Sequence, residues 1–164
     1  MRKSDSELII RYMNYDDIKA VHELECLSFK TPWPPSAFED ELKNEVAVYL
    51  VAEIGNEIAG YVGSWVFLGE CHINNIATAP SYRGMGIARR MLLKLMSIAY
   101  KKGALGMTLE VREHNEPAKK LYEKLNFTYA GKRKKYYSDT GEDAYVMWNN
   151  DILATIVLNG GDKA

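Results

Sequence analysis

Two glycines lie close to three arginines in the middle of the chain, a combination of residues that could bind an anion. Gly84 and Gly86 follow Arg83 and precede Arg89 and Arg90. We expect these glycines at the start of a long helix, where the first backbone N–H groups lack helical partners and the macrodipole is positive. A helix start of this kind binds phosphate. The stretch therefore predicts a site for a phosphate-bearing ligand.

The two glycines allow two other interpretations. The glycines alone could simply shape a connection between a strand and a helix, but the flanking arginines add positive charge, and Gly86 followed by Ala88 lets a bulky anion approach the backbone. A dinucleotide-binding fold would need a third Gly or Ala where this chain has Arg89, and its turn would follow the first strand. This stretch lies mid-chain, so the dinucleotide interpretation is rejected.

Strand-like and helix-like patterns around this stretch predict a mixed α/β sheet with helices on both faces, in the order β-α-α-β-β-β-α-β-α-β-β. We expect one domain over residues 1–164, with a tail of uncertain structure from about residue 150. The expected strands are 8–11, 46–54, 57–67, 71–79, 105–111, 127–137 and 143–148. The expected helices begin near Asn14 or Asp16, at Ser36, near Gly86, and at Asn115 or Glu116.

The strand expected over residues 71–79 is unusually polar for a central strand. Its alternate residues are His72, Asn74, Ile76 and Thr78. A buried strand is normally apolar throughout, and a conflict between pattern and burial often marks a site. Glu110 lies on the polar face of the strand expected over residues 105–111.

A proline-rich break separates the first two expected helices. The first helix carries an apolar stripe that includes Cys26 and Phe29, and the segment 30–35 ends it with three prolines around Trp33. Ser36 with Glu39 three residues later resembles a capping box for the second helix. Trp33 could be a plug of the core or part of a binding site.

At the level of motifs, the pattern Arg83-x-x-Gly86-x-Ala88 resembles the acetyl-CoA pyrophosphate loop of the GCN5-related N-acetyltransferases (GNAT). The later part of the chain resembles the RimI and archaeal protein N-terminal acetyltransferases within that superfamily. The similarity runs from Ile9 to about Trp148. The later residues that carry it are Leu109-Glu110-Val111-Arg112, Asn115, Ala118, Leu121-Tyr122, Phe127, Tyr136-Tyr137 and Gly141-Glu142-Asp143-Ala144-Tyr145.

The resemblance implies a GNAT fold, acetyl-CoA as cosubstrate, and transfer of acetyl to the α-amino group of protein N-termini. It implies that backbone N–H groups near Ile76 and Ala77 hold the thioester carbonyl. The residues expected to bind acetyl-CoA are Ile76, Ala77, Thr78, Arg83, Gly84, Met85, Gly86, Ile87, Ala88, Arg89, Asn115, Ala118 and Tyr122.

Acetylation of an amine needs a base, because a free α-amino group with a pKa near ~8 is mostly protonated at neutral pH. The resemblance makes Glu110 the first candidate, with His72 facing it as the second. Glu110 could instead form a structural ion pair with Arg112, and His72 could be a satisfied core residue. These two ligands would make a poor metal site, and the reaction needs no metal.

Tyr122 is the expected general acid for the departing thiolate, since a phenol with a pKa near ~10 is protonated at neutral pH. It could also be an ordinary amphipathic core residue. Because Cys26 and Cys71 fall outside the matched motifs, we expect direct transfer in a ternary complex and no acetyl-enzyme. Both cysteines are expected to be buried thiols without a disulfide.

The acceptor side is expected to involve aromatic residues. The resemblance places Phe29 and Trp33 near the mouth of the peptide site, with Tyr136 and Tyr137 lining the groove beside Glu110. The basic run 132–135 is either a solvated hairpin face or a surface that docks an acidic nascent chain or the ribosome. An auxiliary subunit is possible but not required.

Composition and charge limit the other classes of function. A net charge of −1 argues against nucleic-acid binding, and no apolar run is long enough to span a membrane. The residues after Met1 do not resemble a signal peptide, so we expect a cytoplasmic protein.

Three alternatives remain open at the level of sequence. The chain could acetylate a small molecule or a lysine side chain, bind acyl-CoA without catalysis, or serve as a docking subunit of a larger complex. The sequence does not reveal which N-termini are accepted, the oligomeric state, or whether Glu110, His72 or a water relay takes the amine proton.

Overall fold

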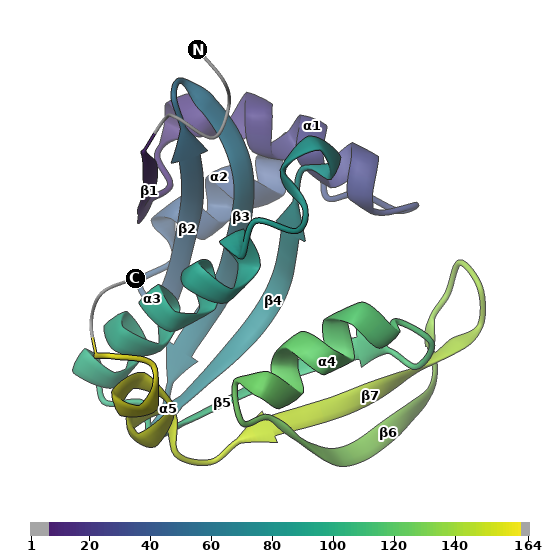
Figure 1. Cartoon of the computed structure of the whole chain (residues 1–164). Helices are drawn as coiled ribbons and strands as arrows, with labels where there is room; N and C mark the ends of the chain where they lie inside the picture. Colours follow the sequence, from purple (N-terminus) through teal and green to yellow (C-terminus); the bar gives the residue numbers. More distant parts are fainter. Residues whose placement is uncertain (1–6, 162–164) are drawn as a thin grey trace. The chain divides into compact units, whose positions relative to one another are not determined.

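The structure is a computed structural model that describes residues 7–161. Within that range, seven strands form a mixed sheet in the order β1-β2-β3-β4-β5-β7-β6 (Figure 1). The predicted order of strands and helices is confirmed through β7, and one further helix, α5, follows it. The predicted fold class is therefore confirmed.

The boundaries agree with the sequence patterns to within one or two residues for most elements. The strands are β1 (Leu8–Tyr12), β2 (Ala47–Ile54), β3 (Glu57–Phe67), β4 (Glu70–Thr78), β5 (Gly106–Arg112), β6 (Thr128–Tyr137) and β7 (Glu142–Asn149). The helices are α1 (Ile18–Ser28), α2 (Pro35–Lys43), α3 (Ile87–Lys101), α4 (Glu116–Lys124) and α5 (Ile152–Leu158), with short 3-10 turns η2 (Tyr15–Asp17) and η3 (Pro80–Tyr82).

The described residues form two compact units. The first contains residues 7–65 and 74–95, and the second contains residues 66–73 and 96–161. Both β4 and α3 contribute residues to each unit. That residues 1–164 make a single acetyltransferase domain remains a prediction.

In the first unit, β1, β2 and β3 pair antiparallel. Five consecutive residues of β2, from Val48 to Ala52, are buried, as expected for a strand covered on both faces. Helices α1 and α2 cover one face of these strands, and the first half of α3 covers the other (Figure 1). The predicted arrangement of helices on both faces is thus present in this unit.

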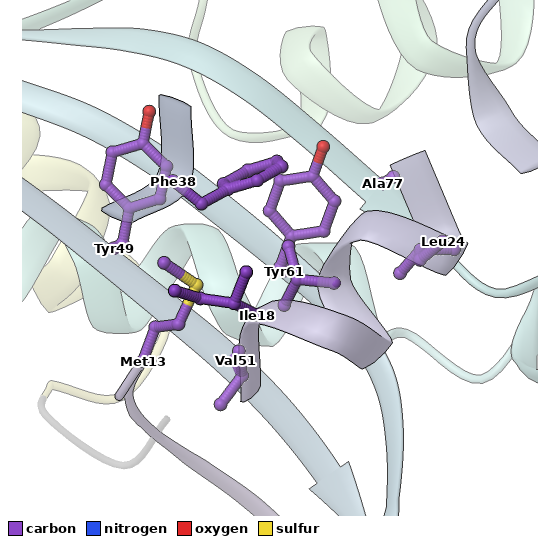
Figure 2. Packing of buried hydrophobic residues seen from close by; sticks show 9 residues of the cluster. Met13, Ile18, Leu24, Phe38, Tyr49, Val51, Tyr61 and Ala77 are labelled. Carbon is purple, nitrogen blue, oxygen red and sulfur yellow. The ribbon is translucent and has the colours of Figure 1, made fainter. Parts of the chain in front are cut away.

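An aromatic cluster fills the core beneath α1 and α2. The Phe38 side chain of α2 is fully buried, and its ring meets those of Tyr49 and Tyr61 edge-on at centroid distances of 6.4 and 5.9 Å. Figure 2 shows these three rings among the apolar side chains of the cluster. Burial of a phenylalanine of this kind stabilises the fold by roughly 1.5–3 kcal/mol.

In the second unit, β5 pairs in parallel with the start of β4 and antiparallel with β7, which in turn pairs with β6. Helix α4 lies along β7, where the Lys119 ammonium is 4.4 Å from the centroid of the Tyr145 ring (Figure 1). Met107, Leu109 and Val111 of β5 are buried.

The segment after residue 150 is more ordered than the sequence indicated. Asp151 caps α5 by accepting a hydrogen bond from the Ala154 N–H at 3.1 Å, and Ile152 and Ile156 are buried. Asn149, which is also buried, donates to the Thr155 hydroxyl at 2.7 Å. Residues 162–164 of the expected tail lie outside the described range. So do residues 1–6, where no signal peptide was expected.

Three local expectations were wrong. Helix α2 has no capping box, because it begins at Pro35, one residue before Ser36, and its N-cap is Pro34. Cys26 is exposed, whereas Cys71 is buried as expected. Helix α1 buries Ile18 and Val21 of the expected apolar stripe, but its second half turns Leu24 and Glu25 toward the core in place of Cys26. Among the described residues, no helix combines the length and apolarity that a membrane crossing demands.

The close contact around Gly63 yields a first prediction. A Cβ on Gly63 would lie 2.2 Å from the Tyr49 ring and 2.8 Å from the Asn75 amide oxygen. We expect Gly63→Ala to lower the free energy of unfolding by about 1–3 kcal/mol, the usual cost of overpacking, in urea titrations.

Gly131→Ala is the matched control, because a Cβ there meets no atom within 4 Å. We expect it to change the free energy of unfolding by no more than about 0.5 kcal/mol. Equal effects of the two substitutions would contradict the contact described for Gly63.

Candidate active site

The predicted anion-binding loop connects η3 to α3 in the first unit. Gly84 and Gly86 adopt φ angles of 79° and 76°, a left-handed conformation that glycine tolerates far better than other residues. A Cβ on either glycine would meet no atom within 4 Å, so the space over the loop is open. The first helical hydrogen bond of α3 runs from the Arg90 N–H to the Gly86 carbonyl at 3.1 Å. An exposed glycine loop at a helix start has the geometry that an anion requires.

The approach to this loop is fixed by neighbouring strands. Tyr82 of η3 is buried and its hydroxyl hydrogen-bonds the Glu57 carboxylate, while the Ala79 N–H donates to the Ala59 carbonyl at 2.7 Å. Gly60 approaches the Ala77 carbonyl so closely that a Cβ would lie 2.9 Å from it. The expected ligand residues Arg83, Met85 and Arg89 are exposed on this supported loop, and Ile87 is buried beneath it. Ile76, Thr78 and Ala88 are half-buried.

In the second unit, His72 and Glu110 meet. The His72 Nε2 lies 2.9 Å from the Glu110 Oε2, and the side chains are 42% and 10% exposed, respectively. The second carboxylate oxygen, Oε1, is 3.5 Å from the Arg133 guanidinium. The imidazole is therefore the accessible member of the pair, and the carboxylate lies behind it.

The pKa values of the pair shift in opposite directions. The hydrogen bond to Glu110 raises the pKa of His72 above its usual value, and burial only partly offsets this effect. Burial alone would raise the pKa of Glu110, but the hydrogen bond and charge of His72, together with Arg133, outweigh it and lower that pKa. Both shifts favour the state in which imidazolium and carboxylate are charged.

Arg112 is not the partner of Glu110. Its guanidinium bonds Asp139 at 2.8 Å and approaches Glu142 at 3.4 Å. It also lies 4.0 Å over the Tyr137 ring. The alternative of a structural Glu110–Arg112 ion pair is therefore wrong, and Arg112 instead orders the β6–β7 hairpin beside the tyrosine pair.

Tyr122 is buried on α4, where its ring packs against Phe127 at 5.8 Å. Burial, together with the nearby Tyr137, raises the pKa of the Tyr122 hydroxyl, so it is protonated at neutral pH. Asn115 is the N-cap of the same helix, and its side-chain oxygen accepts from the Ala118 N–H at 3.3 Å. The side chain of Asn115 thus already has a structural role, and Ala118 is half-buried.

The tyrosine pair lies next to a bulge in β6. The register between β6 and β7 shifts between Arg133 and Tyr137, and Lys135 has a φ of 52°, uncommon for a residue other than glycine. The Lys135 N–H donates to the Asp143 carboxylate at 2.8 Å. The rings of Tyr136 and Tyr137 then meet edge-on at 5.1 Å. No sequence signal indicated this bulge, which is of a kind that often redirects side chains near sites.

The basic run 132–135 is exposed, as expected for a solvated hairpin face, but two of its members are engaged. Lys132 pairs with Glu113 at 2.7 Å. Arg133 contacts Glu110 and also lies 5.7 Å from the centroid of the Tyr136 ring. This strand therefore contributes to the surroundings of the candidate base.

Phe29 and Trp33 lie in the first unit, between α1 and α2, and both are half-buried. Trp33 packs against Phe38 with ring centroids 5.7 Å apart. It is partly a core residue and partly exposed, so both interpretations of this tryptophan remain compatible with its position. Within residues 7–161, no group of three or more His, Cys, Asp or Glu side chains is placed to hold a metal ion.

Comparisons with known proteins define the class. Residues 18–127 match the family model "Acetyltransferase (GNAT) family". The chain is 41% identical over 140 residues to a Bacillus subtilis (strain 168) protein provisionally named a [ribosomal protein bS18]-alanine N-acetyltransferase, with 85% of this chain and 93% of that protein covered. It is 38% identical over 138 residues to N-alpha-acetyltransferase RimI of Mycobacterium tuberculosis, with 80% and 85% covered.

Among solved structures, the ribosomal-protein-S18-alanine N-acetyltransferase of Escherichia coli superposes with a TM-score of 0.80 at 30% identity, with 87% of this chain and 92% of that chain covered. The fold and the matches thus define an acetyltransferase. The chain belongs to the GNAT family, and acetyl-CoA is its cosubstrate, so the predicted family, enzyme class and cosubstrate are confirmed.

The coupling of His72 and Glu110 yields a second prediction. Because the Glu110 hydrogen bond raises the pKa of His72, Glu110→Gln should shift the imidazole titration of His72 to lower pH in NMR spectra. Glu123→Gln, at an exposed glutamate on α4, is the matched control and should leave the His72 titration unchanged. A His72 titration unaffected by the substitution would contradict the coupling.

The same pair predicts how stability depends on pH. The lowered pKa of Glu110 contributes stability above its unfolded value near 4.5, and the raised pKa of His72 contributes stability below its unfolded value near 6.5. The difference in unfolding free energy between the wild type and Glu110→Gln should therefore be largest between these two values and decrease on either side.

Proposed function

We propose that this protein is a protein N-α-acetyltransferase that transfers acetyl from acetyl-CoA directly to the free α-amino group of protein N-termini. The observation that carries the proposal is the hydrogen-bonded His72–Glu110 pair, in which an accessible imidazole has a raised pKa. In its neutral form, an imidazole with a raised pKa is suited to take a proton from an α-ammonium with a pKa near ~8. The relatives named as N-terminal acetyltransferases support the same substrate class.

The glycine loop is proposed to hold the cosubstrate. Backbone N–H groups at the start of α3 would face the pyrophosphate, with Arg83 and Arg89 adding positive charge. The open space over Gly84 and Gly86 supports this assignment, since a side chain at either position would obstruct the approach. Backbone N–H groups near Ile76 and Ala77 would hold the thioester carbonyl, with Thr78 beside them. Ala118 and Asn115 of α4 complete the proposed set.

The proposed chemistry needs a base for the amine and an acid for the departing thiolate. The neutral amine attacks the thioester carbon, so a C–N bond forms and the C–S bond breaks. Before the attack, the His72–Glu110 pair takes one proton from the α-ammonium, directly or through water, and Glu110 holds the imidazole in place. After the attack, the nitrogen loses a second proton, which replaces the one that Tyr122 gives to the thiolate. The backbone N–H groups near Ile76 and Ala77 stabilise the charge that develops on the carbonyl oxygen. Tyr122 donates a proton to the thiolate as it leaves.

The acceptor is proposed to be a peptide segment that contacts Phe29 and Trp33 as well as Tyr136 and Tyr137. Suitable partners are protein N-termini, including those of ribosomal proteins and nascent chains, in the cytoplasm where acetyl-CoA and new N-termini are both available. No auxiliary subunit is required for this chemistry, and transfer takes place in a ternary complex without an acetylated cysteine.

A peptide panel tests the substrate class. We expect acetyl-CoA turnover, measured as thiol release, with short peptides that begin Ser, Ala, Met-Leu or Met-Glu and have free N-termini. The same peptides blocked at the N-terminus but containing lysine, and free polyamines, should give none. Turnover only with polyamines or blocked peptides would contradict the proposed substrate class and leave the GNAT fold unaffected.

Substitution of Glu110, the carboxylate that holds the His72 imidazole, tests the mechanism. Glu110→Gln should lower kcat by about 10²-fold or more, the usual contribution of general-base catalysis, without changing the affinity for acetyl-CoA in calorimetry. Glu123→Gln, an exposed glutamate on α4, is the matched control and should retain wild-type turnover. If both variants are fully active, Glu110 has no part in proton transfer.

A further inference from the structure

Glu25 is a buried carboxylate for which the proposed chemistry has no use. It lies on α1 and is only 2% exposed. It belongs to the first unit and lies beside Tyr61, a member of the aromatic cluster shown in Figure 2. Burial of a charged group among aromatic side chains is costly, so its retention calls for a physical explanation.

The described hydrogen-bond partners of Glu25 are all donors. The Tyr61 hydroxyl donates to Oε2, and the Trp33 N–H donates to Oε1 at 3.3 Å. The Asn75 amide group lies 3.5 Å from Oε2 and donates to the Tyr61 oxygen at 3.1 Å. An ionised carboxylate, which only accepts, matches this set of donors. Burial nevertheless raises the pKa of Glu25 and outweighs the hydrogen bonds from Trp33 and Asn75.

The Trp33 N–H has a special position in its segment. Residues 32, 34 and 35 are prolines and have no N–H group, so Trp33 is the only residue of the four from 32 to 35 with a backbone donor. That donor is bonded to Glu25. A proline-rich segment of this kind cannot be anchored by ladder or helical N–H bonds and depends on the few bonds that remain.

The Trp33 carbonyl is held from the same helix. The His22 Nδ1 lies 3.0 Å from this oxygen, and because a carbonyl only accepts, Nδ1 must carry the hydrogen. Two side chains of α1, one turn apart, therefore bind both polar groups of the Trp33 backbone. The indole packs on Phe38, and Trp33 as a whole is half-buried.

We propose that Glu25 is a positioning residue for the acceptor peptide. Its carboxylate holds the Trp33 backbone, so that the indole forms a fixed wall for the incoming N-terminus. The inference rests on the proposed function, because it assigns the wall to a peptide substrate. Through Tyr61 and Asn75 the same carboxylate connects the Trp33 segment to β4, one residue before Ile76. Glu25 touches neither reacting group and acts only through Trp33 and β4.

The test compares two substitutions. Glu25→Leu removes the hydrogen-bond acceptor of the Trp33 N–H, whereas Glu25→Gln keeps one oxygen for it. Ser64→Ala is the matched control, because Ser64 is fully buried in the same unit and bonds the Val48 carbonyl. All variants are made in the wild-type chain and in a Trp65→Phe, Trp148→Phe background, in which Trp33 is the only tryptophan of the original three.

Activity gives the first result. Glu25→Leu should raise the KM for a free N-terminal peptide at least about tenfold while kcat changes less than about threefold, as expected when ground-state positioning is lost. The affinity for acetyl-CoA should stay unchanged in calorimetry. Glu25→Gln should restore the peptide KM to within about threefold of the wild type, and Ser64→Ala should leave it unchanged.

Trp33 fluorescence gives a second result that does not require activity. In the single-tryptophan background, Glu25→Leu should increase quenching by acrylamide, whereas Glu25→Gln and Ser64→Ala should not. Unchanged quenching in Glu25→Leu would overturn the proposal, and so would equal losses of peptide and acetyl-CoA affinity. If the wild type acetylates no peptide, the proposed function fails, and the quenching result still shows whether Glu25 holds Trp33.

Discussion

The polar side chains of β4 impose the constraint on which much of this molecule depends. A strand inside a sheet has both faces covered, and each polar side chain there needs a hydrogen-bond partner, because an unpaired buried polar group costs roughly 1–3 kcal/mol. His72 finds Glu110 at 2.9 Å, Asn74 donates to the Tyr49 hydroxyl at 3.5 Å, and Asn75 donates to Tyr61 at 3.1 Å. These partners lie on β2, β3 and β5, and they satisfy the hydrogen-bonding requirement of β4.

These pairings give the two units different chemical roles. In the second unit, the partner of β4 is a carboxylate, and the result is a coupled acid–base pair with an accessible imidazole. In the first unit, the partners are phenols, and one of them, Tyr61, extends the network to Glu25 and through it to the Trp33 backbone. One strand thus carries both the candidate base and the link to the candidate acceptor wall, with the glycine loop at its end.

Much of the fold was predictable because apolar periodicity and turn residues agree with the final elements. The Gly84–Gly86 loop was predicted from glycines beside arginines at an expected helix start, and the positive φ angles of both glycines agree with it. His72 stood out because it broke the apolar pattern of a central strand, and the family resemblance made it a candidate base. Glu25 was missed because a charged residue on a helix is normally exposed, and its burial depends on partners distant in sequence. The bulge at Lys135 depends on local geometry that residue types alone do not specify, whereas Asn115 was one of the two expected starts of α4 and forms its cap.

The central claim, that the acceptor is an α-amino group, is tested most directly by tandem mass spectrometry of one peptide that carries both a free N-terminus and an internal lysine. After incubation with the protein and acetyl-CoA, the account predicts a single added acetyl group on the N-terminal nitrogen, with the lysine unmodified. Acetyl on the lysine side chain, or no acetylated peptide while acetyl-CoA binds normally, would contradict it.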